Sequence, residues 1–220
     1  PGSVKEISSY AFQGQPNLKS VVIQMGVNKI GDVSFRNCQK LASVVIPASV
    51  VEIGLSAFGG CINLRSIDIP ENLKDLGEQA FIECQSLESI TLPKGLEIIG
   101  SSTFSGCSNI QVVEIPESIK GIEDCSFSSC TSLKSIVIPE SVTWIKEEAF
   151  RGCSNLESII LPQKINNIGG YTFQACTRLE SIVIPEGLKK IEDSLFEACT
   201  SLRSVNLHEG IEDIYKNAFK

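Results

Sequence analysis

The chain has 220 residues, of which 42% are hydrophobic and 20% are charged, and its formal net charge is −7. This composition is typical of a soluble protein that buries a core, and it excludes a disordered chain. It also excludes a membrane-spanning segment, because the longest apolar runs are only a few residues long. The negative charge disfavours nucleic-acid binding, which requires clustered lysine and arginine.

The negative charge is concentrated in the middle of the chain. Between Asp68 and Asp124 there are eleven acidic and three basic residues, a net charge of −8. A stripe of this kind either steers a basic partner or a cation toward the surface, or is a solvated face that keeps the protein soluble. The composition alone favours the solvated face.

Phenylalanine recurs every 23 residues from one end of the chain to the other. All ten share one register: Phe12, Phe35, Phe58, Phe81, Phe104, Phe127, Phe150, Phe173, Phe196 and Phe219. A fixed period of this length predicts a solenoid, in which each unit buries its apolar face only against its neighbours. The sequence therefore predicts a single domain over residues 1–220, with about nine and a half repeats. Neither end carries a distinctive capping sequence, so we expect a fragment of a longer array.

The first element expected in each unit is a short strand, as the unit at 127–149 illustrates. Residues 135–138 are rich in β-branched side chains and are followed by Pro139, which has no amide hydrogen and ends the pairing. Alternation directs Ile136 inward and Val137 outward.

A second segment and a corner complete the unit. We expect Val142 and Ile145 to form the back wall on an extended or short helical segment. The following Ala149-Phe150, with Cys153, is expected to close the corner as a turn of 3₁₀ helix. Stacked units then place their strands side by side in a parallel sheet, about 4.8 Å apart.

Two inward columns of this stack are nearly uniform, as a buried ladder requires. One holds Leu18, Leu41, Leu64, Leu87, Ile110, Leu133, Leu156, Leu179 and Leu202. The other holds Ile30, Ile53, Leu76, Ile99, Ile122, Ile145, Ile168, Ile191 and Ile214. Burying one such side chain contributes roughly 1.5–3 kcal/mol, most of it available only between coils.

Cysteine forms a further column. Eight cysteines recur every 23 residues: Cys38, Cys61, Cys84, Cys107, Cys130, Cys153, Cys176 and Cys199. Neighbours one strand spacing apart lie within disulfide range, but a buried column of reduced thiols is the favoured interpretation. Cys125 stands outside this column, among residue types too mixed for a core, and we expect a partly exposed thiol there.

The repeat resembles a known family. Leu-x-x-Ile-x-Ile-Pro, at 64–70 and 179–185, matches the strand of leucine-rich repeats, and the motifs from Pro139 to Leu156 resemble the BspA-like class. Gln15, in place of cysteine, and Gln24 and His208, in place of proline, are mild departures. The resemblance implies an α/β-type leucine-rich repeat solenoid, with a parallel β-sheet on one face and short 3₁₀ or extended segments on the other. It also implies a cell-surface or secreted protein that adheres to host or matrix proteins.

Equipment for catalysis is not expected. The chain's single histidine, His208, lies in a turn column otherwise filled by proline, so no base stands beside a serine or cysteine nucleophile. No metal spacing, phosphate loop or dinucleotide fingerprint is present. We therefore expect no enzyme, no catalytic residue, no cofactor and no metal.

Recognition is expected where the outward positions vary. The variable column of the strand face holds Val22, Val45, Asp68, Thr91, Glu114, Val137, Ile160, Val183 and Asn206, beside a nearly uniform serine column. The apolar strip from Val137 to Val183 continues from the acidic centre, and exposed apolar strips can mark contact sites. Trp144 is a further candidate, on the back wall, either as a binding hot spot or as an aromatic ring packed over Gly121.

The sequence thus predicts a non-enzymatic binding module that recognises a protein or glycoprotein, without nucleic acid or membrane insertion. The family resemblance places it outside the cell or at the cell surface. The alternatives are a structural spacer and an intracellular scaffold in the cytoplasm, which reduced thiols would suit.

Overall fold

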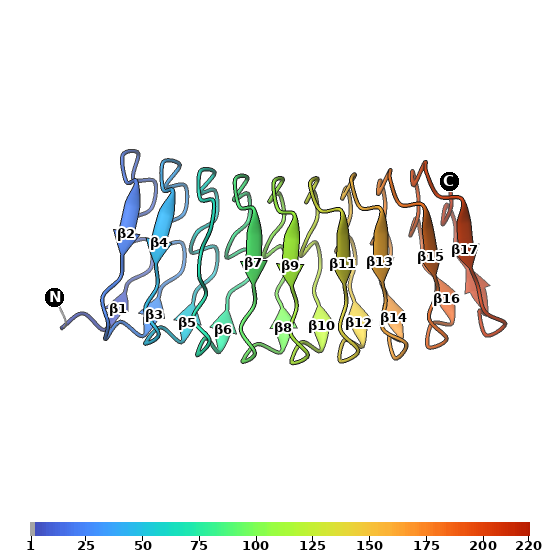
Figure 1. The fold of residues 1–220 in the computed structure, drawn as a ribbon, viewed down its shortest axis with the longest axis horizontal. Helices are drawn as coiled ribbons and strands as arrows, with labels where there is room; N and C mark the ends of the chain where they lie inside the picture. Colours follow the sequence, from blue (N-terminus) through green and yellow to red (C-terminus); the bar gives the residue numbers. More distant parts are fainter. Residues whose placement is uncertain (1–2) are drawn as a thin grey trace.

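The computed structural model describes residues 3–220 as a straight stack of flattened coils, one coil for each repeat (Figure 1). Each coil contributes a strand to one long face and a second, shorter strand to the opposite wall. No helix occurs among residues 3–220, and therefore none long enough to cross a membrane.

The strand face consists of three-residue strands. They are β2 (Ser20–Val22), β4 (Ser43–Val45), β7 (Ser89–Thr91), β9 (Val112–Glu114), β11 (Ser135–Val137), β13 (Ser158–Ile160), β15 (Ser181–Val183) and β17 (Ser204–Asn206). The back wall consists of two-residue strands. They are β1 (Glu6–Ile7), β3 (Lys29–Ile30), β5 (Glu52–Ile53), β6 (Asp75–Leu76), β8 (Ile98–Ile99), β10 (Gly121–Ile122), β12 (Trp144–Ile145), β14 (Asn167–Ile168), β16 (Lys190–Ile191) and β18 (Asp213–Ile214).

Every strand pair is parallel and pairs residues one repeat apart. Ile136 pairs with Ile159 between β11 and β13, and Gly121 pairs with Trp144 between β10 and β12. Alternation along β11 is as predicted, because Ile136 is buried and Val137 is exposed. The leucine and isoleucine columns are buried throughout the middle coils, and they become accessible only toward the ends, as at Leu202 and Ile214.

The phenylalanines form a continuous stacked column. Successive rings lie nearly parallel with centroids 5.1–5.9 Å apart, including Phe81 and Phe104 at 5.8 Å. This spacing confirms that the coils lie in register, and the offset of more than 5 Å lies within the range that stacked aromatic rings prefer.

The corner that follows each back-wall strand is not the expected 3₁₀ helix, and the α/β description is wrong. Consecutive amides in the corner alternate between two kinds of acceptor. The amides of Cys125 and Phe127 donate to carbonyls of the next coil at 3.0 and 2.8 Å, whereas the amide of Ser128 donates back to Cys125 at 3.0 Å. Because only alternate amides bond three residues back, no helical ladder can form, and the chain is an all-β solenoid.

Two residues in most corners have a left-handed backbone. One column includes Val33 and Cys125, with φ of 59° and 56°, and a second includes Glu83, with φ of 57°, and Gly60. Non-glycine residues rarely adopt this region. Here the hydrogen bonds to the neighbouring coils hold them in it.

The cysteine column is buried, as expected, and all of its thiols are free. Each donates to the carbonyl of the phenylalanine 26 residues earlier, for example Cys107 to Phe81 at 3.2 Å and Cys153 to Phe127 at 3.1 Å. Burial raises the pKa of the Cys107 and Cys153 thiols to about 12. These cysteines therefore act as small apolar side chains that also cap main-chain carbonyls.

Candidate functional site

The outward row of the strand face presents apolar side chains to solvent at both ends of an acidic centre. Val137, Ile160 and Val183 are each 60–63% exposed, and they come from three successive coils. On the other side of the centre, Val22 and Val45 are 62% and 56% exposed. The row of nine candidates therefore faces solvent as predicted, with Asp68, Thr91, Glu114 and Asn206 also exposed.

One exposed apolar residue of this face was not predicted. Val112 stands where the neighbouring coils have Ser89 and Ser135, and its side chain is exposed. The signal was present in the sequence, since valine interrupts the serine column at this coil and Ile110 interrupts the leucine column. Substitutions in columns that are otherwise uniform therefore mark the coil whose surface differs.

The strand face is hydrogen-bonded in pairs and is not one continuous sheet. β7 pairs with β9 and β11 with β13, but β9 and β11 are not paired. The amide of Ile138 donates to the carbonyl of Ile160 at 3.1 Å across the β11–β13 junction. Within residues 3–220 the equivalent amide of Ile115 has no main-chain acceptor. An interruption of the sheet therefore separates β9 from β11.

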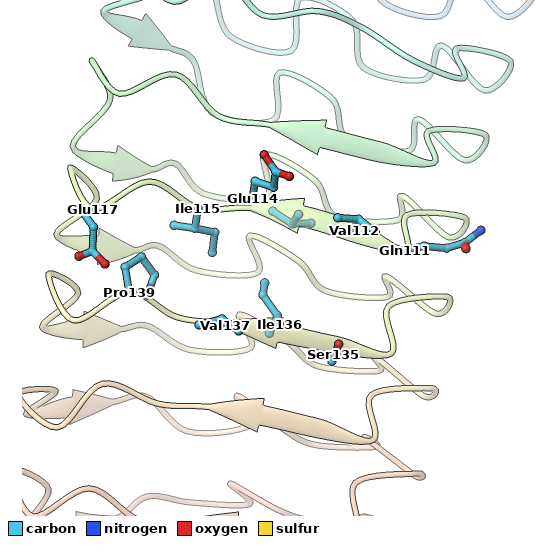
Figure 2. A pocket seen from close by; sticks show the side chains of 10 residues that line it. Gln111, Val112, Glu114, Ile115, Glu117, Ser135, Ile136, Val137 and Pro139 are labelled. Atoms are coloured by element: carbon cyan, nitrogen blue, oxygen red, sulfur yellow. The ribbon is translucent and has the colours of Figure 1, made fainter.

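A groove of about 420 Å³ opens at this interruption (Figure 2). Ile115, Ile136 and Pro139 point into the space between the two coils. Val113 and Ile115 are half-buried, whereas the equivalent Ile136 and Ile138 of the next coil are 3% and 2% exposed. The groove thus gives solvent access to apolar side chains that other coils enclose.

Carboxylates lie at the rim of the groove. Glu114 is turned toward the preceding coil, where the Thr91 hydroxyl donates to it at 3.3 Å, and Glu117 lies near Pro139. Neither carboxylate forms an ion pair with any residue that the structure describes. Glu123, by contrast, is held by Lys146 at 2.6 Å on the back wall. The groove is therefore apolar inside and negatively charged at its edge.

Trp144 packs over Gly121, one of the two explanations the sequence offered for it. A β-carbon on Gly121 would overlap the indole ring, so only glycine leaves room for it. The indole nitrogen donates to Glu123 at 3.3 Å, and Lys146 neutralises the same carboxylate. Because these contacts fix the ring on the back wall, Trp144 lies away from the strand face and its groove.

Cys125 is partly exposed, as expected, and Glu148 lies nearby. Its thiol lies 3.9 Å from the Glu148 carboxylate, which is itself paired with Arg151 at 2.8 Å. Burial, and then the nearby carboxylates, raise the pKa of this thiol above its ordinary value. A raised pKa lowers the thiolate fraction, which is the opposite of what a reactive cysteine requires. Among residues 3–220, no three metal-ligating side chains come together.

Comparison with known proteins identifies the repeat. A family model described as "BspA type Leucine rich repeat region" matches residues 5–134 and 97–220. A leucine-rich repeat protein from Bacteroides ovatus is 32% identical, with a TM-score of 0.89, over 97% of this chain and 56% of its own. This chain thus spans about half the length of that relative. A comparison with curated proteins gives no match.

Two further crystal structures are similar. The leucine-rich repeat protein of T. pallidum is 30% identical, with a TM-score of 0.63, over 74% of this chain and 73% of its own. A leucine-rich cell surface protein from Faecalibacterium prausnitzii is 26% identical, with a TM-score of 0.60, over 98% of this chain and 74% of its own.

Proposed function

Because the chain belongs to the BspA-type leucine-rich repeat family, we propose that it is a recognition module that binds a protein or glycoprotein through its strand face. The observation that carries this proposal is the outward row of that face. Its inward columns are nearly uniform, whereas the outward row changes from apolar to acidic and back to apolar. A solenoid that served only as a spacer would have no need for this exposed apolar surface.

The proposed setting is the cell surface or the extracellular space. Support comes from the F. prausnitzii relative, which is described as a cell surface protein. The repeated domain over residues 1–220 would then present its strand face as one segment of a longer array, in line with the greater length of the B. ovatus protein. The reduced thiols agree equally with a cytoplasmic scaffold, which is the alternative to this setting.

The proposal is tested with one variant of the strand face and one matched control. The test variant combines Val137→Ser, Ile160→Ser and Val183→Ser. The control combines Leu55→Ser and Ile98→Ser, which remove exposed apolar side chains from other surfaces. Binding to a panel of immobilised matrix proteins is measured together with the melting temperature of each variant.

We expect the strand-face variant to bind at least about tenfold more weakly than the wild type at a nearly unchanged melting temperature. The control variant should bind like the wild type. Equal binding by the wild type and both variants, or binding by none of them, would exclude this surface and favour a structural spacer.

A further inference from the structure

The groove between β9 and β11 lies where the two halves of the outward row meet. On one side Val137, Ile160 and Val183 form an exposed apolar strip, and on the other side Glu114 continues into the acidic centre. Val112 extends the apolar surface across the junction. A partner that covers this region must therefore place apolar side chains on one part of its contact surface and positive charge beside them.

From this arrangement we propose that the partner presents an amphipathic helix, laid along the solenoid axis, with aliphatic side chains on one face and lysine or arginine at one end. This inference rests on the proposed function and specifies the partner. The aliphatic side chains lie on the strip from Val137 to Val183. One further aliphatic side chain enters the groove beside Ile115, and the basic end lies next to Glu114 and Glu117.

The spacing of the coils favours a helix over an extended segment. Ring centroids of successive coils in this region are 5.3–5.9 Å apart. One face of an α-helix presents side chains three and four residues apart, which at a rise of about 1.5 Å per residue gives steps of about 4.5 and 6 Å. An extended strand presents one face in steps of about 6.6–6.8 Å and loses register within a few coils. The nearly straight stack suits a straight helix (Figure 1).

Charge complementarity determines the basic end. Glu114 and Glu117 lack ion-pair partners, and the region from Asp68 to Asp124 carries a net charge of −8. An acidic partner would meet repulsion there, whereas a basic side chain at the rim of a half-enclosed apolar groove gains attraction with little desolvation. The helix comes from another protein and not from a second copy of this segment, because residues 3–220 contain no helix.

The test uses three fluorescein-labelled synthetic peptides with blocked ends. The first is an alanine-based helix with leucine on three successive turns of one face and lysine on the next turn. The second replaces its lysines with glutamate. The third keeps the composition of the first but has a central proline that breaks the helix. Fluorescence anisotropy gives Kd for the wild type and for the variant Glu114→Gln with Glu117→Gln.

We expect the basic helical peptide to bind at least about tenfold more tightly than the other two peptides. The Glu114→Gln and Glu117→Gln pair should raise its Kd about fivefold and reduce the salt dependence of binding. A matched control, Glu71→Gln with Glu88→Gln, removes two exposed acids of the same region away from the groove and should change Kd less than twofold.

Equal binding of the proline-interrupted peptide, an unaffected Kd in the Glu114 and Glu117 variant, or no binding of any peptide would overturn the helix proposal. These outcomes are distinct from failure of the proposed function. If matrix binding is lost in the strand-face serine variant while the helical peptide shows no preference, the proposed function stands and the helix proposal fails. If the serine variant loses nothing, both fail.

Discussion

The corner and the strand face of the same coils differ in how they join one coil to the next. In the corner, the amides equivalent to Cys125, Phe127 and Ser129 donate to the next coil at every junction between Tyr10 and Lys220. On the strand face, the pairing is interrupted between β9 and β11 and again between β13 and β15. The stack is therefore held together at its corner, and the strand face is free to differ from coil to coil.

This difference explains which columns the sequence keeps uniform. Phenylalanine and cysteine occupy the corner, where each side chain touches its counterparts above and below. The outward row of the strand face contacts solvent, so a change there alters recognition and not stacking. The following predictions sharpen this comparison.

The largest expected effect is loss of stability at alkaline pH, originating in the corner. Burial raises the pKa of Cys61, Cys107 and Cys153 to about 12, from an ordinary value of 9.0. The unfolded chain releases thiol protons that the folded chain retains. The stabilisation is therefore complete below about pH 9 and is lost as pH rises toward 12, at about 1.4 kcal/mol per thiol and pH unit.

Urea unfolding of the reduced, oxygen-free protein between pH 8 and pH 10.5 measures this slope. A variant with Cys61→Ala, Cys107→Ala and Cys153→Ala should show a shallower decline, which separates the thiols from the lysines and tyrosines that titrate in the same range. Identical slopes would show that the thiol column contributes nothing to the pH dependence.

The second effect is the cost of a cavity in the corner compared with the strand face. Phe104→Ala removes a fully buried ring stacked between Phe81 and Phe127 and should reduce the free energy of unfolding by about 3–5 kcal/mol. Val137→Ala, on the exposed row, should change it by less than about 0.5 kcal/mol. Comparable losses in chemical denaturation would contradict the assignment of stability to the corner.

The smallest effect concerns backbone strain. Glu83 is exposed and left-handed, with φ of 57°, in a column where Gly60 and Gly106 occupy the same position. Glu83→Gly should therefore raise the melting temperature, with a gain of about 0.5–1 kcal/mol. Glu88→Gly, just before β7, should lower it by a similar amount, because glycine there only adds freedom to the unfolded chain. A decrease in both variants would show that the corner carries no strain at Glu83.

Much of the fold followed from the period alone. A spacing of 23 residues without insertion makes Phe81 and Phe104 neighbours, and the alternation in 135–138 fixes which side chains point outward. The hydrogen bonding of the corner did not follow. The column of Tyr10, Val33 and Cys125 contains no glycine to signal a left-handed backbone, although glycine at 14, 60, 106 and 152 signalled the other column.

The candidate site was predictable in its row but not in its groove. Which residues face solvent depends on alternation, so the exposed row from Val22 to Asn206 could be predicted from the sequence. Whether two neighbouring strands are paired depends on small differences in coil spacing that no single residue encodes. Only the departures at Ile110 and Val112 distinguished the coil that borders the groove.

Native-state hydrogen exchange tests the contrast between corner and strand face most directly. The account predicts the strongest protection for the amide of Phe104, which donates to Ser126 at 2.8 Å in the corner. On the strand face, the amide of Ile138, bonded to Ile160, should exchange more slowly than the amide of Ile115, which faces the groove. Equal exchange at Ile115 and Ile138, or faster exchange at Phe104 than at either, would contradict it.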